Sequence, residues 1–387
     1  MLKVGIIQLE QHTEVARALI RALEAVFIEP ILFLSKVVHD DLHETREINT
    51  YDVAIWQKGQ SCNEFFYAHE TQLKSCDATI CTSEKTMDGQ FITFRWPCTS
   101  YLMLHDTHTS FVPFQHFNVL HGFPNSFIQY LRLAKYILLR KGEERQRAME
   151  SFEHYLLPSE EMYHYVSTQP WFDGKIKSYL PIACHDACAV PNFHQEEIVI
   201  SIPGSITPKR KDLDILLNAF SQISLRTNHK LRVQFLGKAI DKNGIKWTEE
   251  LMKLNSAQMS IHIFENYISQ LEFDFYLHQS DFLILPISLH KADLFNELYG
   301  FSAVSGNIND MTRCGIPALI SASYPIPLAW QGTICKQYAD EEELANLVIQ
   351  WIENQEYQKL KKEASQILHP FGMDEIGNRI KKLLFNI

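Results

Sequence analysis

The chain has 387 residues, of which 46% are hydrophobic and 21% charged, so it is long enough for two or three globular domains with their own cores. Its net charge of −10 argues against a general nucleic-acid binder. The first residues, Met1-Leu-Lys-Val-Gly, run directly into a predicted strand, and no apolar run reaches about eighteen residues. We therefore expect no signal peptide and no membrane-spanning helix, and a cytoplasmic protein.

The eight cysteines are scattered, which in a large intracellular chain favours isolated buried thiols. Cys184 and Cys188 flank His185 and Asp186, an arrangement that would suit a metal ion. Because no second close pair accompanies them, we expect no metal site.

Strands and helices alternate along the first half of the chain, which predicts a parallel sheet covered on both faces. The apolar runs predict strands at 3–8, 29–34, 51–56, 77–81, 101–104 and 155–157, with an amphipathic helix at 13–27. We assign residues 1–187 to an N-terminal Rossmann-like domain on the acceptor side.

The pattern breaks between His185 and Gln195, which we interpret as a linker, and then starts again. Strands are predicted at 197–202, 231–236, 260–264, 281–286 and 318–321, and helices at 212–221, 270–278 and 340–387, the last with a break at His369-Pro370. These elements predict a second Rossmann-like domain over 195–368 and a C-terminal helix over 369–387 that packs back toward the first domain. The predicted fold class is α/β, with two Rossmann-like domains facing across a cleft.

The stretch 281–326 predicts one βαβ unit with an oversized loop. DFLILPI is a buried strand, and the long polar loop after it carries Glu297, Tyr299 and Gly300. Ser305 stands where a helix should begin and Gly315 where it should end. Ligands of open α/β sheets bind at the carboxyl ends of the strands, and a helix start there suits a phosphate.

A second candidate segment is PGSITPKRKD, which follows a predicted strand and opens a helix. Gly204 permits a sharp turn before Ser205, and Lys209, Arg210 and Lys211 bring positive charge to it. The segment indicates a clamp for a diphosphate, and the alternative is a solvated basic turn.

Two histidine-containing loops follow strands of the first half. His105 and Asp106 close the strand at 101–104, where a histidine is suited to donate to a substrate hydroxyl or to a developing negative charge. Glu10 and His12 follow the first strand, in a loop without the Gly-x-Gly-x-x-Gly pattern of dinucleotide-binding dehydrogenases. The alternative for His105 is a capping or core residue.

Together these segments resemble the GT-B glycosyltransferases, and in particular the retaining, group-1-like (family 4-like) enzymes. PGSITPKRKDLDILLNAF resembles their phosphate-clamp segment, SDFLILPI the strand before the donor loop, and ELYGFSAVSGNINDMTRCGIPALIS the donor-sugar loop and helix. LMLHD and LLPSEEMYHYV resemble segments of the N-terminal half. The family pairs two glutamates eight positions apart, whereas this chain has Glu297 and then Ser305, so Asn307 or Asp310 would take over ribose recognition.

The resemblance implies transfer of a sugar from a nucleotide diphosphate sugar to an acceptor hydroxyl, with retention of configuration, in the synthesis of cell-surface glycans or glycoconjugates. It implies no metal and no cofactor beyond the donor substrate, because basic groups and helix dipoles neutralise the leaving diphosphate. His105 and Glu297 would contact the sugar. The implied donor-binding residues are Gly204, Ser205, Arg210, Lys211, Tyr299, Gly300, Ser305, Gly306, Asn307 and Asp310, and those on the acceptor side are Glu10, His12 and Asp106.

Other functions fit the same pattern. A GT-B epimerase or pyruvyl transferase would share both halves, and a degenerate nucleotide-sugar-binding scaffold would explain Ser305. A periplasmic sugar-binding protein would need a signal peptide. The expected partners are a nucleotide-sugar donor and a glycan, lipid-linked or protein-linked acceptor. The basic and apolar segment 123–141 predicts a helix at the inner membrane face, with a core-packed helix as the alternative.

Overall fold

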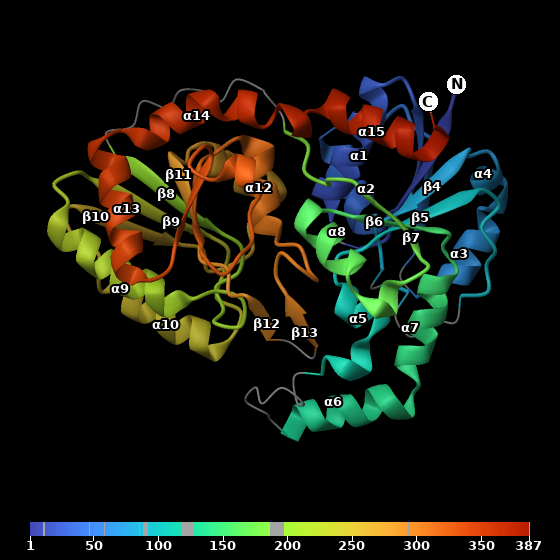
Figure 1. Ribbon diagram of the computed structural model, residues 1–387, viewed down its shortest axis with the longest axis horizontal. Helices are drawn as coiled ribbons and strands as arrows, with labels where there is room; N and C mark the ends of the chain where they lie inside the picture. The colour runs from blue at the N-terminus through green and yellow to red at the C-terminus, as the bar shows by residue number, and fades with distance from the viewer. Residues whose placement is uncertain are drawn as a thin grey trace. The chain divides into compact units, whose positions relative to one another are not determined.

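The computed structural model divides the chain into two compact units (Figure 1). It describes residues 1–10, 12–45, 47–57, 59–84, 86–87, 92–117, 127–185, 197–292 and 295–386. Unit 1 consists of Met1–Cys184, Ala292–Val304 and Met373–Ile387, and unit 2 of His185–Lys291 and Ser305–Gly372. Each unit is built around a parallel sheet with helices packed on it.

Unit 1 has a seven-stranded sheet in the order β3-β2-β1-β4-β5-β6-β7, and all its recorded strand pairs are parallel. The strands are β1 (Lys3–Gln8), β2 (Glu29–Ser35), β3 (Val53–Trp56), β4 (Ala78–Cys81), β5 (Thr99–Met103), β6 (His154–Leu157) and β7 (Ile176–Tyr179). The helices are α1 (Thr13–Ala25), α2 (Lys36–Glu44), α3 (Cys62–Ala68), α4 (Glu70–Lys74), α5 (Thr107–Phe111), α6 (Phe127–Leu138), α7 (Lys141–Glu150), α8 (Glu160–Ser167) and α15 (Met373–Phe385).

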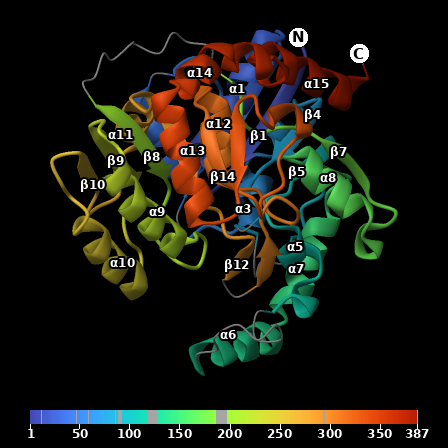
Figure 2. The same cartoon turned by 60° about the vertical axis from the view of Figure 1, so that its left-hand side comes forward.

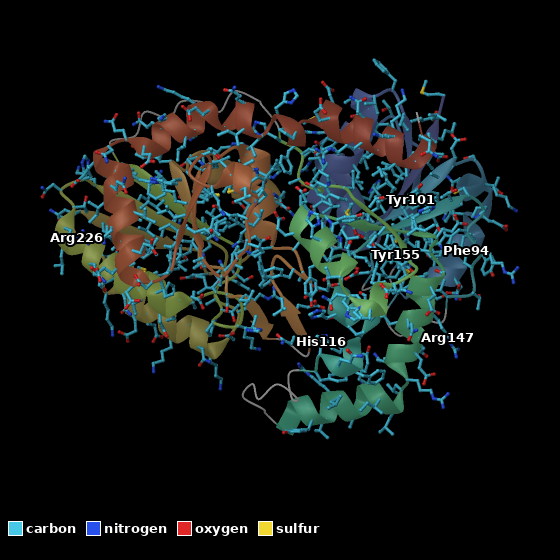
Figure 3. The ribbon with its side chains drawn as sticks, in the orientation of Figure 1. Phe94, Tyr101, His116, Arg147, Tyr155 and Arg226 are labelled. Atoms are coloured by element: carbon cyan, nitrogen blue, oxygen red, sulfur yellow. The ribbon has the colours of Figure 1, made fainter. Side chains whose placement is uncertain are left out.

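The central strands of unit 1 are buried, which explains their nearly continuous apolar sequences. Side chains on the two faces of the sheet belong to two separate hydrophobic clusters, one under α1 and α15 and the other under α3 and α8. The second cluster is rich in aromatic rings, among them Phe94 and Tyr155 (Figure 3). Tyr155 on β6 donates its hydroxyl to the carbonyl of Met149, so its polar end has a partner inside the core.

The last helix of the chain, α15, packs on the first, α1 (Figure 2). A Cβ atom added to Gly377 would collide with the carbonyl oxygen of Ala22, so only glycine permits this close approach. Tyr101 on β5 donates a hydrogen bond of 3.1 Å to the carbonyl of Leu383. The predicted return of the C-terminal helix to the N-terminal domain is confirmed.

Unit 2 has a six-stranded sheet in the order β10-β9-β8-β11-β14-β15, again with parallel pairs. Its strands are β8 (Ile198–Pro203), β9 (Leu231–Leu236), β10 (Met259–Ile263), β11 (Phe282–Leu285), β14 (Ala318–Ser321) and β15 (Cys335–Tyr338). Its helices are α9 (Leu213–Arg226), α10 (Lys242–Met252), α11 (Gln270–His278), α12 (Gly306–Cys314), α13 (Glu341–Glu353) and α14 (Glu356–Ile367). Two short strands, β12 (His290–Ala292) and β13 (Asn296–Leu298), form a separate small sheet.

The predicted α/β fold class, with two parallel-sheet domains, is confirmed. The division of the chain differs from the sequence-based one chiefly in 292–304, which belongs to unit 1 although we placed it inside the second domain. In addition, His185 and 369–372 belong to unit 2, although we assigned them to the N-terminal domain and to the C-terminal helix. Strands β7, β12, β13 and β15 have no counterpart among the predicted elements. Most of the predicted linker, 186–195, lies outside the described residues. Among the residues that the structure describes, no helix is long and apolar enough to cross a membrane.

Candidate functional site

In unit 2, two glycines bring the loops after β8 and β9 into contact. Gly204 follows β8 with a φ of +82°, a conformation that other residues rarely adopt. A Cβ atom on Gly237, just after β9, would lie 2.7 Å from the backbone of Gly204. Because Gly237 has no side chain, the turn at Gly204 packs directly against the loop after β9.

The buried side chain of Lys211 supports the same turn from the protein interior. Its Nζ donates to the carbonyls of Pro203 at 2.5 Å and Gly204 at 2.8 Å, and only 5% of the residue is exposed. Burial lowers the pKa of Lys211 to about 7, with an opposing effect from Asp310 and a smaller lowering from Arg210. Two of the three ammonium protons are thus committed to the backbone, which makes Lys211 chiefly a support for the loop.

The start of α12 lies beside this turn. The side-chain Oδ1 of Asn307 is 3.1 Å from the position of a Cβ on Gly204, and Lys211 Nζ is 3.7 Å from the same position. Ser305 is the N-cap of α12, and its side chain makes no capping hydrogen bond. Nothing lies within 4 Å of a Cβ added to Gly306. The helix start therefore presents backbone N–H groups next to open space, as an anion site requires.

The other predicted donor-binding residues of unit 2 differ in their exposure and in their contacts. Arg210 is exposed and Ser205 half-buried. Asp310 is 3.4 Å from Arg313, which also forms an ion pair of 2.7 Å with Asp274. Asp310 is therefore held in a charged network.

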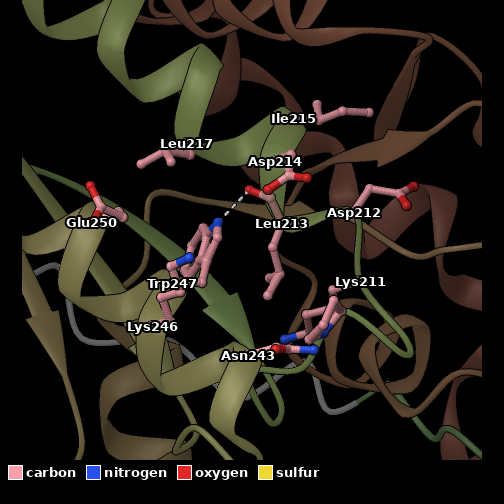
Figure 4. A pocket seen from close by; sticks show the side chains of 11 residues that line it. Lys211, Asp212, Leu213, Asp214, Ile215, Leu217, Asn243, Lys246, Trp247 and Glu250 are labelled. Carbon is pink, nitrogen blue, oxygen red and sulfur yellow. Dashed lines mark hydrogen bonds between the residues drawn. The ribbon is translucent and has the colours of Figure 1, made fainter.

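A cavity of about 520 Å³ lies between the starts of α9 and α10 (Figure 4). It is lined by Lys211 and Asp212 from the predicted clamp and by Trp247, which donates to the carbonyl of Leu213 at 2.8 Å. Burial raises the pKa of Asp212, whereas a hydrogen bond from Ser288 lowers it. Gly204 and α12 do not line this cavity.

In unit 1, the structure brings together the two predicted histidine loops. The rings of His12 and His105 stack with their centroids 5.9 Å apart. His12 Nε2 is 3.9 Å from Glu10 Oε2, and Glu10 also accepts a hydrogen bond from the backbone of Thr86. Glu10, His12 and His105 thus form one cluster at the carboxyl ends of β1 and β5.

Glu84, a residue that the sequence analysis missed, supports this cluster. Its carboxylate is fully buried and accepts from the backbone N–H groups of His105 at 3.2 Å and Asp106 at 3.0 Å. Arg145 Nη2 lies 3.8 Å away and balances the charge. Its position three residues after β4, at the ligand end of a buried strand, is the signal that could have identified it.

Glu297 has a different environment from the predicted one. Its carboxylate, 1% exposed, accepts from the backbone and hydroxyl of Thr109 at 2.6 and 2.5 Å, from Ser302 Oγ at 2.6 Å and from the backbone of His108 at 3.3 Å. Burial, followed by the charge of Asp106, raises the pKa of Glu297 to about 7, against these hydrogen bonds. With four protein donors on two oxygens, the carboxylate caps α5 and has little capacity left for sugar hydroxyls.

Tyr299, Gly300 and Asp106 belong to the same part of unit 1. Gly300 has a φ of +86° and donates to the carbonyl of Ala303 at 2.7 Å, and Asp106 pairs with Ala303 as an isolated bridge. Tyr299 is buried. These residues form a tight turn on α5, so the predicted donor loop is split between Tyr299 and Gly300 in unit 1 and Ser305 in unit 2.

Within the described part of the chain, no group of three or more His, Cys, Asp or Glu side chains is arranged to hold a metal ion. Cys188 and Asp186, which the sequence analysis considered for such a site, lie outside the described residues. The possible ligand His185 points its Nδ1 at the carbonyl of Thr312, 3.1 Å away.

The sequence matches no protein-family model and no curated protein. The structure, in contrast, is similar over its whole length to solved structures. Anabaena HepE, crystallised with UDP and with UDP-glucose, is 13% identical with a TM-score of 0.60, and all of both chains is covered. The pneumococcal O-GlcNAc transferase GtfA, in complex with UDP and GlcNAc, is 8% identical with a TM-score of 0.59, covering 100% of this chain and 99% of GtfA.

The UDP-GlcNAc 2-epimerase of Neisseria meningitidis, bound to UDP-GlcNAc, is also similar, at 14% identity and a TM-score of 0.55, with all of both chains covered. Identities this low carry information on the fold alone. Together with the two parallel sheets, these similarities show that the chain has the GT-B fold.

Proposed function

We propose that the protein is a glycosyltransferase that uses a nucleotide diphosphate sugar, with UDP as the first nucleotide to test. The observation that carries the proposal is the whole-length similarity to structures that hold UDP, UDP-glucose or UDP with GlcNAc. The local support is in unit 2, where the turn at Gly204 lies beside the start of α12. This is the combination of backbone N–H groups and basic residues that a diphosphate requires.

In the proposed reaction, the bond between the anomeric carbon and the diphosphate oxygen breaks, and a bond to the acceptor oxygen forms as the acceptor hydroxyl gives its proton to the leaving diphosphate. The N–H groups of α12 and the guanidinium of Arg210 would stabilise the charge that develops on the leaving diphosphate, so no metal is required. His105, backed by Glu84 and stacked on His12, would contact the donor sugar from unit 1. We also propose, from the sequence resemblance, that the configuration of the sugar is retained. The same resemblance supports a role in the cytoplasmic synthesis of cell-surface glycans, with a glycan, lipid-linked or protein-linked acceptor.

The test is a thermal-shift panel of UDP, GDP and ADP with the matching nucleosides, followed by assays of nucleotide release from the stabilising nucleotide sugars. A diphosphate present at about a hundred times its Kd should stabilise the folded protein by about 2.7 kcal/mol, whereas the nucleoside should stabilise it far less. If no nucleotide diphosphate raises the melting temperature, the chain is a scaffold without donor binding and the proposal is wrong.

Sugar epimerisation is the second candidate, because the Neisseria epimerase covers the whole chain equally well. The two reactions leave different products from UDP-GlcNAc in the absence of acceptor. An epimerase would bring UDP-GlcNAc to equilibrium with its C2 epimer, whereas a transferase would release UDP slowly and leave the configuration at C2 unchanged. NMR of the reaction mixture separates the two outcomes.

A further inference from the structure

Helix α6 of unit 1 exposes an unusual amount of apolar surface. Within the helix and the turn after it, the exposed fractions are 49% for Tyr130, 54% for Leu131, 51% for Ile137, 80% for Leu138 and 50% for Leu139. Figures 1 and 2 show the helix at the edge of unit 1, away from the sheet. Apolar residues gathered in this way usually mark a surface that contacts something else.

The exposed apolar residues within the helix itself share one face. At about 100° per residue, Ile137, Tyr130, Leu138 and Leu131 fall within an arc of about 120°, and Ala134 lies in its middle. We call this surface the α6 face. Lys135 lies about 40° beyond one edge of the arc, whereas Arg132 lies about 160° from its middle, on the side of Tyr136.

The opposite side of the helix attaches it to unit 1. Tyr136 is 8% exposed, and its ring lies 5.6 Å from that of Phe117 and 5.3 Å from that of Phe295. At the following turn, a Cβ atom on Gly142 would come within 2.8 Å of the ring of Phe114. The helix is therefore seated on an aromatic cluster, with the α6 face pointing away from it.

The charge of this segment is opposite to that of the chain. Arg132, Lys135, Arg140 and Lys141 are its charged residues, and no acidic residue occurs between Asp106 and Glu143. The chain as a whole carries 46 acidic residues and a net charge of −10. A positively charged segment beside an exposed apolar face complements an anionic lipid surface.

We propose that the α6 face docks on the surface of a bilayer that contains anionic lipid. The helix lies in the plane of the interface, with Leu131, Ile137 and Leu138 among the acyl chains and Tyr130 at the headgroup level. Lys135 and the basic pair after the helix contact the lipid phosphates. With 12 residues the helix is too short to span a bilayer, so the contact is peripheral.

The experiment is flotation of the full-length protein with vesicles of phosphatidylcholine alone or mixed with phosphatidylglycerol. The wild type should float with the mixed vesicles at low salt, and much less with phosphatidylcholine or at high salt. The double variant Leu131→Glu/Leu138→Glu should lose at least tenfold in partitioning. The matched control is Leu225→Glu, on α9 of unit 2, which is 86% exposed and should float like the wild type.

A second variant, Lys135→Ala/Arg140→Ala, tests the charge and leaves the apolar residues unchanged. Each cation near an anionic surface contributes about 1 kcal/mol, or about fivefold, so the pair should weaken partitioning about 25-fold. A melting curve of each variant establishes that it is folded, since all four positions are on the surface.

Three results would overturn the proposal. These are a wild type that stays at the bottom with anionic vesicles, equal binding to both kinds of vesicle, and a Leu131→Glu/Leu138→Glu variant that floats as well as the control. If sedimentation shows that this variant turns a dimer into a monomer and the wild type ignores vesicles, a second copy covers the face instead. The thermal shift caused by UDP, measured on the same proteins, reports separately on the proposed function.

Discussion

Lys211 and Arg210 are neighbours in the predicted phosphate clamp, but their environments differ. The Lys211 ammonium is buried and bonded to two carbonyls, whereas Arg210 is exposed on the turn. A guanidinium on an exposed turn is free to reorient toward a diphosphate and to bind it with two parallel hydrogen bonds. We therefore expect the two residues to respond differently to substitution.

Arg210→Ala should weaken UDP binding by about 1.5–3 kcal/mol, the usual contribution of hydrogen bonds to charged groups, and leave uridine binding unchanged. Isothermal titration of both ligands measures the effect. Lys209→Ala removes an exposed cation from the same turn and serves as the control, with a smaller loss. An equal loss of UDP and uridine affinity would argue against a diphosphate contact. Lys211→Ala should instead lower the melting temperature without ligand, because two buried carbonyls would lose their donor.

His105 belongs to unit 1, whereas the predicted nucleotide contacts belong to unit 2. His105→Ala should therefore leave UDP affinity nearly unchanged and lower turnover about a hundredfold, the scale of losing one positioned polar group. His164→Ala, which alters an exposed histidine on α8 of the same unit, should have no effect on turnover. A folded His105→Ala protein with full transfer activity would refute the predicted role. A lower melting temperature with proportionate loss of all functions would make His105 a structural residue.

At the scale of elements, α5 is a helix of five residues that two remote carboxylates hold in place. Glu84 accepts from the backbone just before it, and Glu297 accepts from His108 and Thr109 in its first turn. Without such acceptors, the first N–H groups of a buried helix have no partners. The positions of His105 and of the loop 297–303 therefore depend on each other.

The raised pKa of Glu297 predicts how stability depends on pH. Its pKa in the folded state is about 7, above the ordinary value of 4.5, so the folded state binds the proton more tightly. The stability that this preference contributes is complete below about pH 4.5 and is lost as pH rises through about 7. The melting temperature of the wild type, relative to Glu297→Gln, should therefore fall between pH 5 and pH 8.

The control for this experiment is Glu64→Gln, on the capping box of α3. The backbone and hydroxyl of Ser61 hold the pKa of Glu64 below its ordinary value, so Glu64 stays ionised throughout that range. Its difference from the wild type should not change between pH 5 and pH 8. A Glu297→Gln difference that is equally flat would show that Glu297 ionises normally in the folded protein.

At the scale of the molecule, unit 1 is assembled from both ends of the chain. Helix α15, the last element, fills the face of the sheet next to α1, and Ile376 and Ile380 join the hydrophobic cluster there. Unit 1 is therefore incomplete until the whole of unit 2 has been synthesised.

Gly377→Ala should destabilise unit 1 by about 1–3 kcal/mol, because the added methyl group forces α15 away from the backbone of α1. Gly306→Ala, at the open start of α12, is the control and should leave the melting temperature unchanged. Denaturant unfolding followed by tryptophan fluorescence measures both. A Gly377→Ala protein as stable as the wild type would show that the two helices separate without cost.

The sequence by itself determined the alternating strands and helices and the ends of α12, because these depend on local properties. A buried parallel strand such as β11 is a continuous apolar run, and a helix that ends at Gly315 needs a left-handed residue at that position. The same local reasoning located the turn at Gly204 and the histidine loop of β5. This local reasoning did not predict strands β7 and β15, because their sequences, IKSY and CKQY, mix polar and apolar residues.

The tertiary structure decided the burial and the hydrogen-bond partners of each polar group. Glu297 is bonded to Thr109, 188 positions away, so no spacing rule in the loop could show that its carboxylate is buried and occupied. The same holds for Glu84 beneath His105, for Lys211 beneath Gly204 and for the outward direction of the α6 face. Local sequence limits the backbone conformations of a segment, whereas burial and hydrogen-bond partners depend on which distant segments pack against it.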